Sequence, residues 1–106
     1  PMPKTKFYEL YQDYVCGCVL RIAREVFALL PVKKVYIHAV GEVFDSATGI
    51  VKEATILSTM IPKATLSRLN FDYLDCSDAM QNFNHNMKFR KTKGFEAVEK
   101  ITPERE

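Results

Sequence analysis

The chain has 106 residues, of which 47% are apolar and 26% are charged, and its formal net charge is +2. This composition excludes disordered, collagen-like and low-complexity proteins and predicts one domain over residues 1–106. The small net charge excludes a strong overall attraction to polyanions.

The first predicted element is one long helix over residues 5–30, with Thr5 as its N-cap and Pro31 directly after its end. Apolar residues recur along it in two neighbouring rows, which together cover more than half of the circumference. The first row comprises Phe7, Tyr11, Tyr14, Cys18, Ile22 and Leu29, and the second comprises Val15, Val19, Ala23, Val26 and Leu30. A helix of this length spans the whole domain, so we expect it to be the central element.

Residues 32–45 and 49–62 predict an antiparallel hairpin, with Gly49 at a positive φ in the turn. We expect Phe44 opposite Ile50 and Glu42 opposite Lys52, with a bulge at Gly41. Glu42 and Glu53 then project to opposite faces and cannot share a metal ion. Both faces of this hairpin are apolar, so each must be covered.

The rest of the chain predicts a short helix over residues 62–69, a helix over 76–86 that begins after Asp75, and an edge strand over 87–92. Gly94 ends that strand. The fold class is therefore α+β, with a long N-terminal helix packed on a small antiparallel sheet. Residues 1–4 and 102–106 are expected to be frayed.

The segment 85–95 is basic and aromatic, which is compatible with a nucleic-acid-binding module. Its candidate contacts are Lys88, Arg90, Lys91, Lys93 and Phe95. Strict alternation favours the other interpretation, an edge strand whose cations prevent edge-to-edge association. Nucleic-acid binding is therefore the less favoured alternative.

A metal-dependent nuclease-like enzyme is a further alternative, with Asp72, Asp75, Asp78 and Lys88 as its residues. Capping of a helix is a simpler role for Asp75 and Asp78. His38 is either a general base or a hydrogen-bonded core histidine. We predict no cofactor, since the sequence contains no phosphate-binding loop or nucleophile motif.

Three cysteines, Cys16, Cys18 and Cys76, form an odd set that argues against a disulfide framework and predicts a cytoplasmic protein. No apolar run reaches the roughly 18 residues of a membrane span, so we expect no membrane partner. The first residue is Pro1 rather than Met, which is compatible with a domain cut from a longer protein.

The main functional hypothesis is a protein-interaction or homo-oligomerisation domain, most simply a homodimer. It depends on the apolar residues of both hairpin faces and on the wide apolar arc of the helix, which together exceed what one copy can bury. The candidate interface residues are Tyr8, Tyr11, Tyr36, Phe44 and Ile56.

Overall fold

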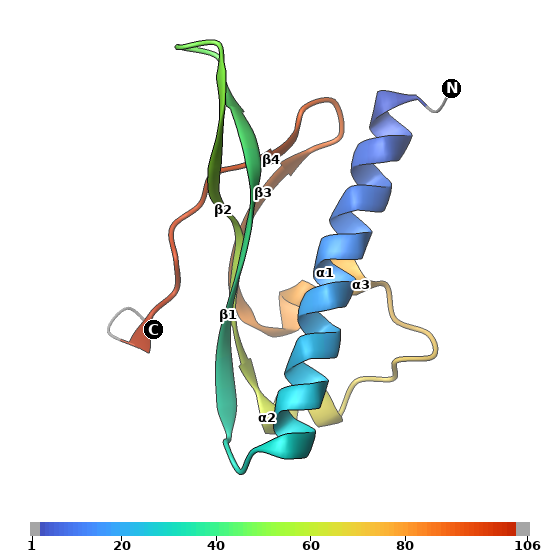
Figure 1. The fold of residues 1–106 in the computed structure, drawn as a ribbon. Helices are drawn as coiled ribbons and strands as arrows, with labels where there is room; N and C mark the ends of the chain where they lie inside the picture. The colour runs from blue at the N-terminus through green and yellow to red at the C-terminus, as the bar shows by residue number, and fades with distance from the viewer. Residues whose placement is uncertain (1–2, 104–106) are drawn as a thin grey trace.

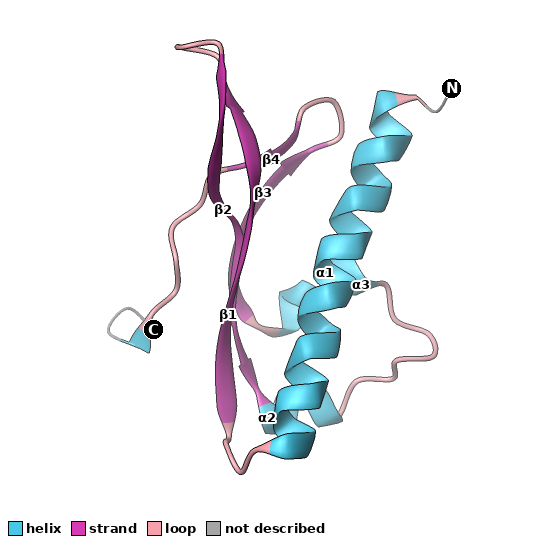
Figure 2. Ribbon diagram, in the orientation of Figure 1, coloured by secondary structure: helices cyan, strands magenta, loops and turns pink. Residues whose placement is uncertain are grey.

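A long helix lies across one face of a four-stranded antiparallel sheet in the computed structural model, which describes residues 3–103 (Figure 1). Strands that are consecutive in sequence are also neighbours in the sheet. In that order they are β1 (Lys34–Asp45), β2 (Ile50–Pro62), β3 (Asn84–Arg90) and β4 (Gly94–Glu96). The predicted α+β class and the predicted long helix are thereby confirmed (Figure 2).

The helix α1 spans Lys4–Leu29, close to its predicted range. Pro3 takes the N-cap position instead of Thr5 and makes no side-chain capping bond. Leu30 is extended at φ −126° and ψ 142°, as expected for a residue that precedes a proline. Lys4 is helical rather than frayed, and the expectation for residues 1–2 and 104–106 falls outside the described residues.

The turn between β1 and β2 contains residues 46–49 and is closed by Asp45. Its Oδ1 accepts a hydrogen bond from the Ala47 N–H at 2.9 Å, and its carbonyl accepts one from the Gly49 N–H at 2.7 Å. Gly49 has φ 73°, which confirms the predicted positive value. These bonds fix the loop length, so Asp45 pairs with Ile50.

The register of this hairpin differs by one residue from the predicted one. Phe44 lies opposite Val51, and Glu42 lies opposite Glu53. The expected Glu42–Lys52 pair is lost because an exposed charge pair contributes under about 1 kcal/mol, too little to outweigh the turn geometry. The two glutamates therefore share a face, which corrects the inference that they project to opposite ones.

A β-bulge shifts the pairing between Ala39 and Val40, near the predicted position. Leu57 faces Ala39 and Thr55 faces Val40, so Ile56 is the extra residue and turns toward α1 instead of the outer face. Gly41 is not the bulged residue, but its lack of a side chain leaves room for Ile56 and Tyr11. A Cβ atom there would lie 2.8 Å from Ile56 Cδ1 and 3.1 Å from the Tyr11 hydroxyl.

The helices between β2 and β3 are shorter than predicted. Helix α2 (Lys63–Ser67) follows Pro62 as expected, but α3 (Cys76–Ala79) ends in a 3₁₀ turn over Met80–Asn82. The predicted helix over 76–86 is therefore wrong beyond this turn. Asparagines after the turn favour helix weakly, and residues 84–87 instead pair with β2.

The core lies between the inner face of the sheet and α1. Small and medium side chains of the helix, such as Cys16, Leu20 and Ala23, pack against Leu57 and Ile61 of β2. A second, smaller cluster near the turn joins Val43, Ile56 and Phe95.

The C-terminal segment, defined as residues 97–101, crosses the outer face of the sheet (Figure 1). The Val98 N–H donates to the Thr55 carbonyl at 2.9 Å, and the Ile101 N–H donates to Ser58 Oγ at 2.7 Å. Ile101 is buried in this position. The chain thus covers the middle of its own outer face, although the turn end of the hairpin stays uncovered. Within residues 3–103, no helix combines the length and apolar character needed to cross a membrane.

Candidate interaction surface

The outward side of α1 carries an apolar row, which we call the outer stripe. It comprises Phe7, Leu10, Tyr14, Ile22 and Leu29. The exposed fraction is 55% for Phe7, 68% for Tyr14 and 80% for Leu29. All of these residues except Leu10 belong to the first apolar row, which the sequence predicted to be buried together with its neighbour. The sheet instead packs on the arc with Cys16, Leu20 and Ala23, which leaves the outer stripe exposed. Figure 1 shows α1 lying on one face of the sheet.

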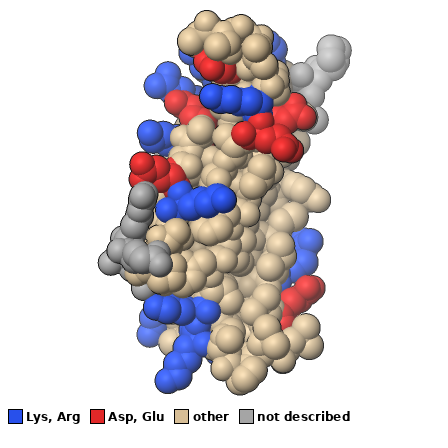
Figure 3. Space-filling model, turned by 60° about the vertical axis from the view of Figure 1, so that its left-hand side comes forward, with Lys and Arg blue, Asp and Glu red and all other residues tan. Residues whose placement is uncertain are grey.

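A second apolar surface lies on the outer face of the hairpin near its turn, where Val40, Phe44 and Val51 are exposed. The directly opposed pair Glu42 and Glu53 lies among them. The face shown in Figure 3 has an uncharged area in its centre, with charged side chains at both ends and at mid-height along its edges. Burial of this second surface would bring two like charges out of water, which disfavours it as an interface.

Two of the predicted interface residues belong to the inner side of the molecule. Ile56 is only 1% exposed and lies in the core, because the bulge turned it inward. It is therefore removed from the candidate interface. Tyr11 packs edge-on against Phe95 with ring centroids 5.4 Å apart and is half-buried.

The other three predicted interface residues are at least partly accessible. Tyr8 is half-buried, and its ring occupies the space where a Cβ atom of Gly94 would be. Tyr36 is half-buried on the outer face, with Lys34 Nζ 5.7 Å from its ring centroid. Phe44 is exposed but lies on the hairpin rather than beside the outer stripe. The structure therefore does not gather the predicted residues on one surface.

Two of the four cations of the basic segment, Arg90 and Lys91, form ion pairs within the chain. Arg90 Nε lies 3.1 Å from Glu96 Oε2, and Lys91 Nζ lies 3.7 Å from Glu9 Oε1. Phe95, expected to stack on bases, is 6% exposed. Lys88 and Lys93 are exposed and line different pockets.

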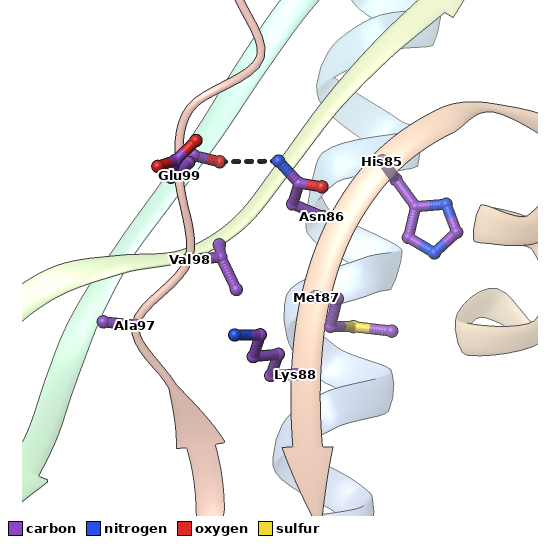
Figure 4. A pocket seen from close by; sticks show the side chains of 7 residues that line it. All are labelled: His85, Asn86, Met87, Lys88, Ala97, Val98 and Glu99. Atoms are coloured by element: carbon purple, nitrogen blue, oxygen red, sulfur yellow. Dashed lines mark hydrogen bonds between the residues drawn. The ribbon is translucent and has the colours of Figure 1, made fainter.

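The first of these pockets has a volume of about 570 Å³ and opens where β3 separates from the C-terminal segment (Figure 4). Asn86 Nδ2 closes one end by donating to the Glu99 carbonyl at 2.9 Å. Lys88 extends into the gap toward Val98, whereas His85 points to the other side of β3 (Figure 4). The lining also includes Asn86 and Glu99, and the side chains of Lys88 and His85 point to different sides of β3, so these two groups do not converge in the pocket (Figure 4).

His38 is a hydrogen-bonded histidine of the outer face. Its Nδ1 lies 2.8 Å from Ser58 Oγ, which is fully buried and also accepts the Ile101 N–H. Burial, and then the positive charge of Lys100, lower the pKa of His38 below its ordinary 6.5. The neutral ring can accept a hydrogen bond from the Ser58 hydroxyl. Ser58 therefore connects His38 of β1 to Ile101 of the C-terminal segment. With Ser58 buried, the pair is a structural contact and offers no accessible nucleophile.

The acidic residues proposed for a metal site have other partners or lie apart. Asp75 caps α3, since its Oδ1 accepts from the Asp78 N–H at 3.0 Å and from the Ser77 hydroxyl at 2.7 Å. This confirms the predicted start of that helix. Across residues 3–103, no three His, Cys, Asp or Glu side chains are placed to share one metal ion.

The three cysteines are free thiols in different surroundings. Cys16 is buried in the core beside Met87, with the two sulfur atoms 3.9 Å apart. Its burial raises the pKa of this thiol to about 12, with a further contribution from Asp13. Cys18 is half-buried within the arc of the outer stripe.

Comparison of the chain with protein-family models, with curated proteins and with solved structures finds no significant match. The function is therefore inferred from the surfaces and contacts of the protein itself.

Proposed function

We propose that this domain is a homodimerisation domain and that two copies associate through the outer stripe of α1. The observation that supports this proposal is that α1, a 26-residue helix, packs one arc on the sheet and exposes a second arc that is mostly apolar and is interrupted by Arg21 and Glu25. Soluble proteins seldom leave large contiguous apolar surfaces uncovered, and those that do use them for association.

The extent of the outer stripe supports this proposal. Its five side chains expose roughly 500 Å² per copy, on the usual areas of aromatic and aliphatic side chains. A symmetric pair would thus bury on the order of 1,000 Å² from these residues alone, close to the lower limit of specific interfaces. Neighbouring side chains would add to this area. Closed twofold dimers are the commonest way for one chain to cover such a surface.

The nucleic-acid-binding alternative has weaker support. Phosphate groups would have to displace Glu96 from Arg90 and Glu9 from Lys91, and Phe95 is buried away from any base. Binding to single- and double-stranded oligonucleotides at two salt concentrations tests this alternative. Salt-sensitive binding would favour it, because phosphate contacts release counterions.

Sedimentation velocity with Tyr14→Glu tests the proposed dimer. Glutamate is compatible with an exposed helical position, but burial of its charge in an apolar interface is costly. We expect the wild type to be a dimer at micromolar concentration and Tyr14→Glu to raise the dissociation constant by at least about 100-fold.

Tyr73→Glu is the matched control, since Tyr73 is 87% exposed and lies in a loop outside the outer stripe. It should leave the dissociation constant unchanged. A wild type that sediments as a monomer throughout the micromolar range would overturn the proposal. Equal weakening by both substitutions would also count against the outer stripe as the interface.

A further inference from the structure

Four of the five residues of the outer stripe, all except Leu10, are placed symmetrically about Cys18. Phe7 and Leu29 each lie 11 residues from Cys18, on opposite sides, and Tyr14 and Ile22 each lie 4 residues from it. At 100° per residue these five positions fall within an arc of about 80° on the helix surface. The face therefore has nearly the same spacing when read from either end.

We infer that the two copies pack their α1 helices antiparallel, about a twofold axis that passes beside Cys18. This inference rests on the proposed homodimer and specifies its geometry. In this arrangement Phe7 of one copy faces Leu29 of the other, Tyr14 faces Ile22, and the two Cys18 residues face each other. The levels on either side of the central Cys18 pair then each join one aromatic to one aliphatic side chain, which gives a similar helix separation on the two sides.

The charges of α1 favour this direction over a parallel one. The first turn contains no acidic residue, and the last turn contains no basic residue. An antiparallel pair brings Lys4 of each copy to the C-terminal end of the partner helix, where the dipole attracts a cation. A parallel pair would instead place the lysines of both first turns together.

Glu25 gives a second reason. It lies 18 residues after Phe7, which is five full helical turns, and so occupies the middle of the outer stripe. In a parallel pair Glu25 of one copy would lie opposite Glu25 of the other copy, and the two neighbouring negative charges would repel each other. In the antiparallel pair the two Glu25 residues lie seven residues to either side of Cys18, about 21 Å apart along the helices, so they do not face each other.

Disulfide cross-linking tests the direction. On oxidation with diamide, two facing thiols lose two protons and two electrons, which reduce the diazene to a hydrazine, and an S–S bond forms between the copies. This requires Cα atoms within about 7 Å of each other. Wild-type protein should cross-link through Cys18, and Cys18→Ser should remove that product on a non-reducing gel.

The relative direction of the two α1 helices is determined with two further variants. Tyr14→Cys and Ile22→Cys are each introduced separately into the Cys18→Ser protein. We expect neither protein to cross-link to itself, whereas an equimolar mixture should give a dimer whose linked peptides contain residues 14 and 22. Tyr73→Cys in the same background reports random collisions and should give little product. Mass spectrometry of the linked peptides identifies each pair.

The outcomes separate the two proposals. A dimer in which Tyr14→Cys and Ile22→Cys each cross-link to themselves would show a parallel pair, which overturns this inference and leaves the homodimer intact. A dimer that forms no cross-link at positions 14, 18 or 22 uses another surface and overturns both proposals. A wild type that sediments as a monomer also overturns both.

Discussion

Ser58→Ala should destabilise the protein more than its small change in volume suggests. Ser58 Oγ is the point where the C-terminal segment meets the outer face of the sheet, with the Ile101 N–H at 2.7 Å and His38 Nδ1 at 2.8 Å. The side chain is fully buried, so water cannot replace the lost hydroxyl without opening the segment.

The size of the effect follows from what the substitution leaves behind. A buried backbone N–H without an acceptor costs about 1–3 kcal/mol, and His38 loses a partner at a more accessible position, which adds less. We therefore expect a loss of about 2 kcal/mol in the free energy of unfolding. For a domain of this size this corresponds to roughly 8–16 °C in Tm.

Urea denaturation at a fixed protein concentration measures this loss, since any dimer makes the apparent stability depend on concentration. Ser67→Ala is the matched control, because Ser67 is exposed and bonds only to the nearby Ala64 carbonyl at 2.9 Å. It should change the free energy by less than about 0.5 kcal/mol. If Ser58→Ala were equally mild, the C-terminal segment would not be held through Ser58, and the reasoning would fail.

Three further predictions concern single positions. Gly94→Ala should destabilise more than Gly49→Ala in urea denaturation, since both residues have positive φ but only at Gly94 would a Cβ atom meet the Tyr8 ring, at 2.9 Å; equal losses would refute the importance of this contact. Cys16, with its pKa raised to about 12, should resist iodoacetamide in the native protein and react after unfolding, as followed by mass spectrometry; rapid native labelling would contradict its burial. The lowered pKa of His38 means that the unfolded chain binds this proton more readily, so its contribution is complete above pH 6.5 and is lost as pH falls through the folded-state pKa. His38→Gln should flatten this part of the stability–pH curve, and an unchanged curve would show that another group causes it.

Much of the fold was predictable because local patterns decide it. The helical spacing of apolar residues and the proline at position 31 define α1 within one residue at each end. The β-branched segments and Gly49 define the hairpin, and Asp75 defines the start of α3. Each of these signals depends on a residue's own conformational preference or on neighbours within one turn.

The candidate interface was less predictable, since its residues are distinguished only by packing. Periodicity identifies two apolar rows on α1 but cannot rank which of them the sheet will cover. Cys16, Leu20 and Ala23 pack with Leu57 and Ile61 in the core, and this packing leaves Tyr14 and Leu29 exposed. The prediction of Ile56 as an interface residue failed for a related reason, because one extra residue in β2 reversed its face.

The sequence by itself determined the α+β class, the long helix α1, the β1–β2 hairpin and the start of α3, since these depend on composition and local spacing. Only the tertiary structure decided the hairpin register, the inward arc of α1 and the course of residues 97–101 over the outer face. These features depend on contacts between residues far apart in the chain, such as Ser58 with Ile101 and Gly41 with Tyr11, where shape and hydrogen bonding select one arrangement among several that the sequence pattern allows.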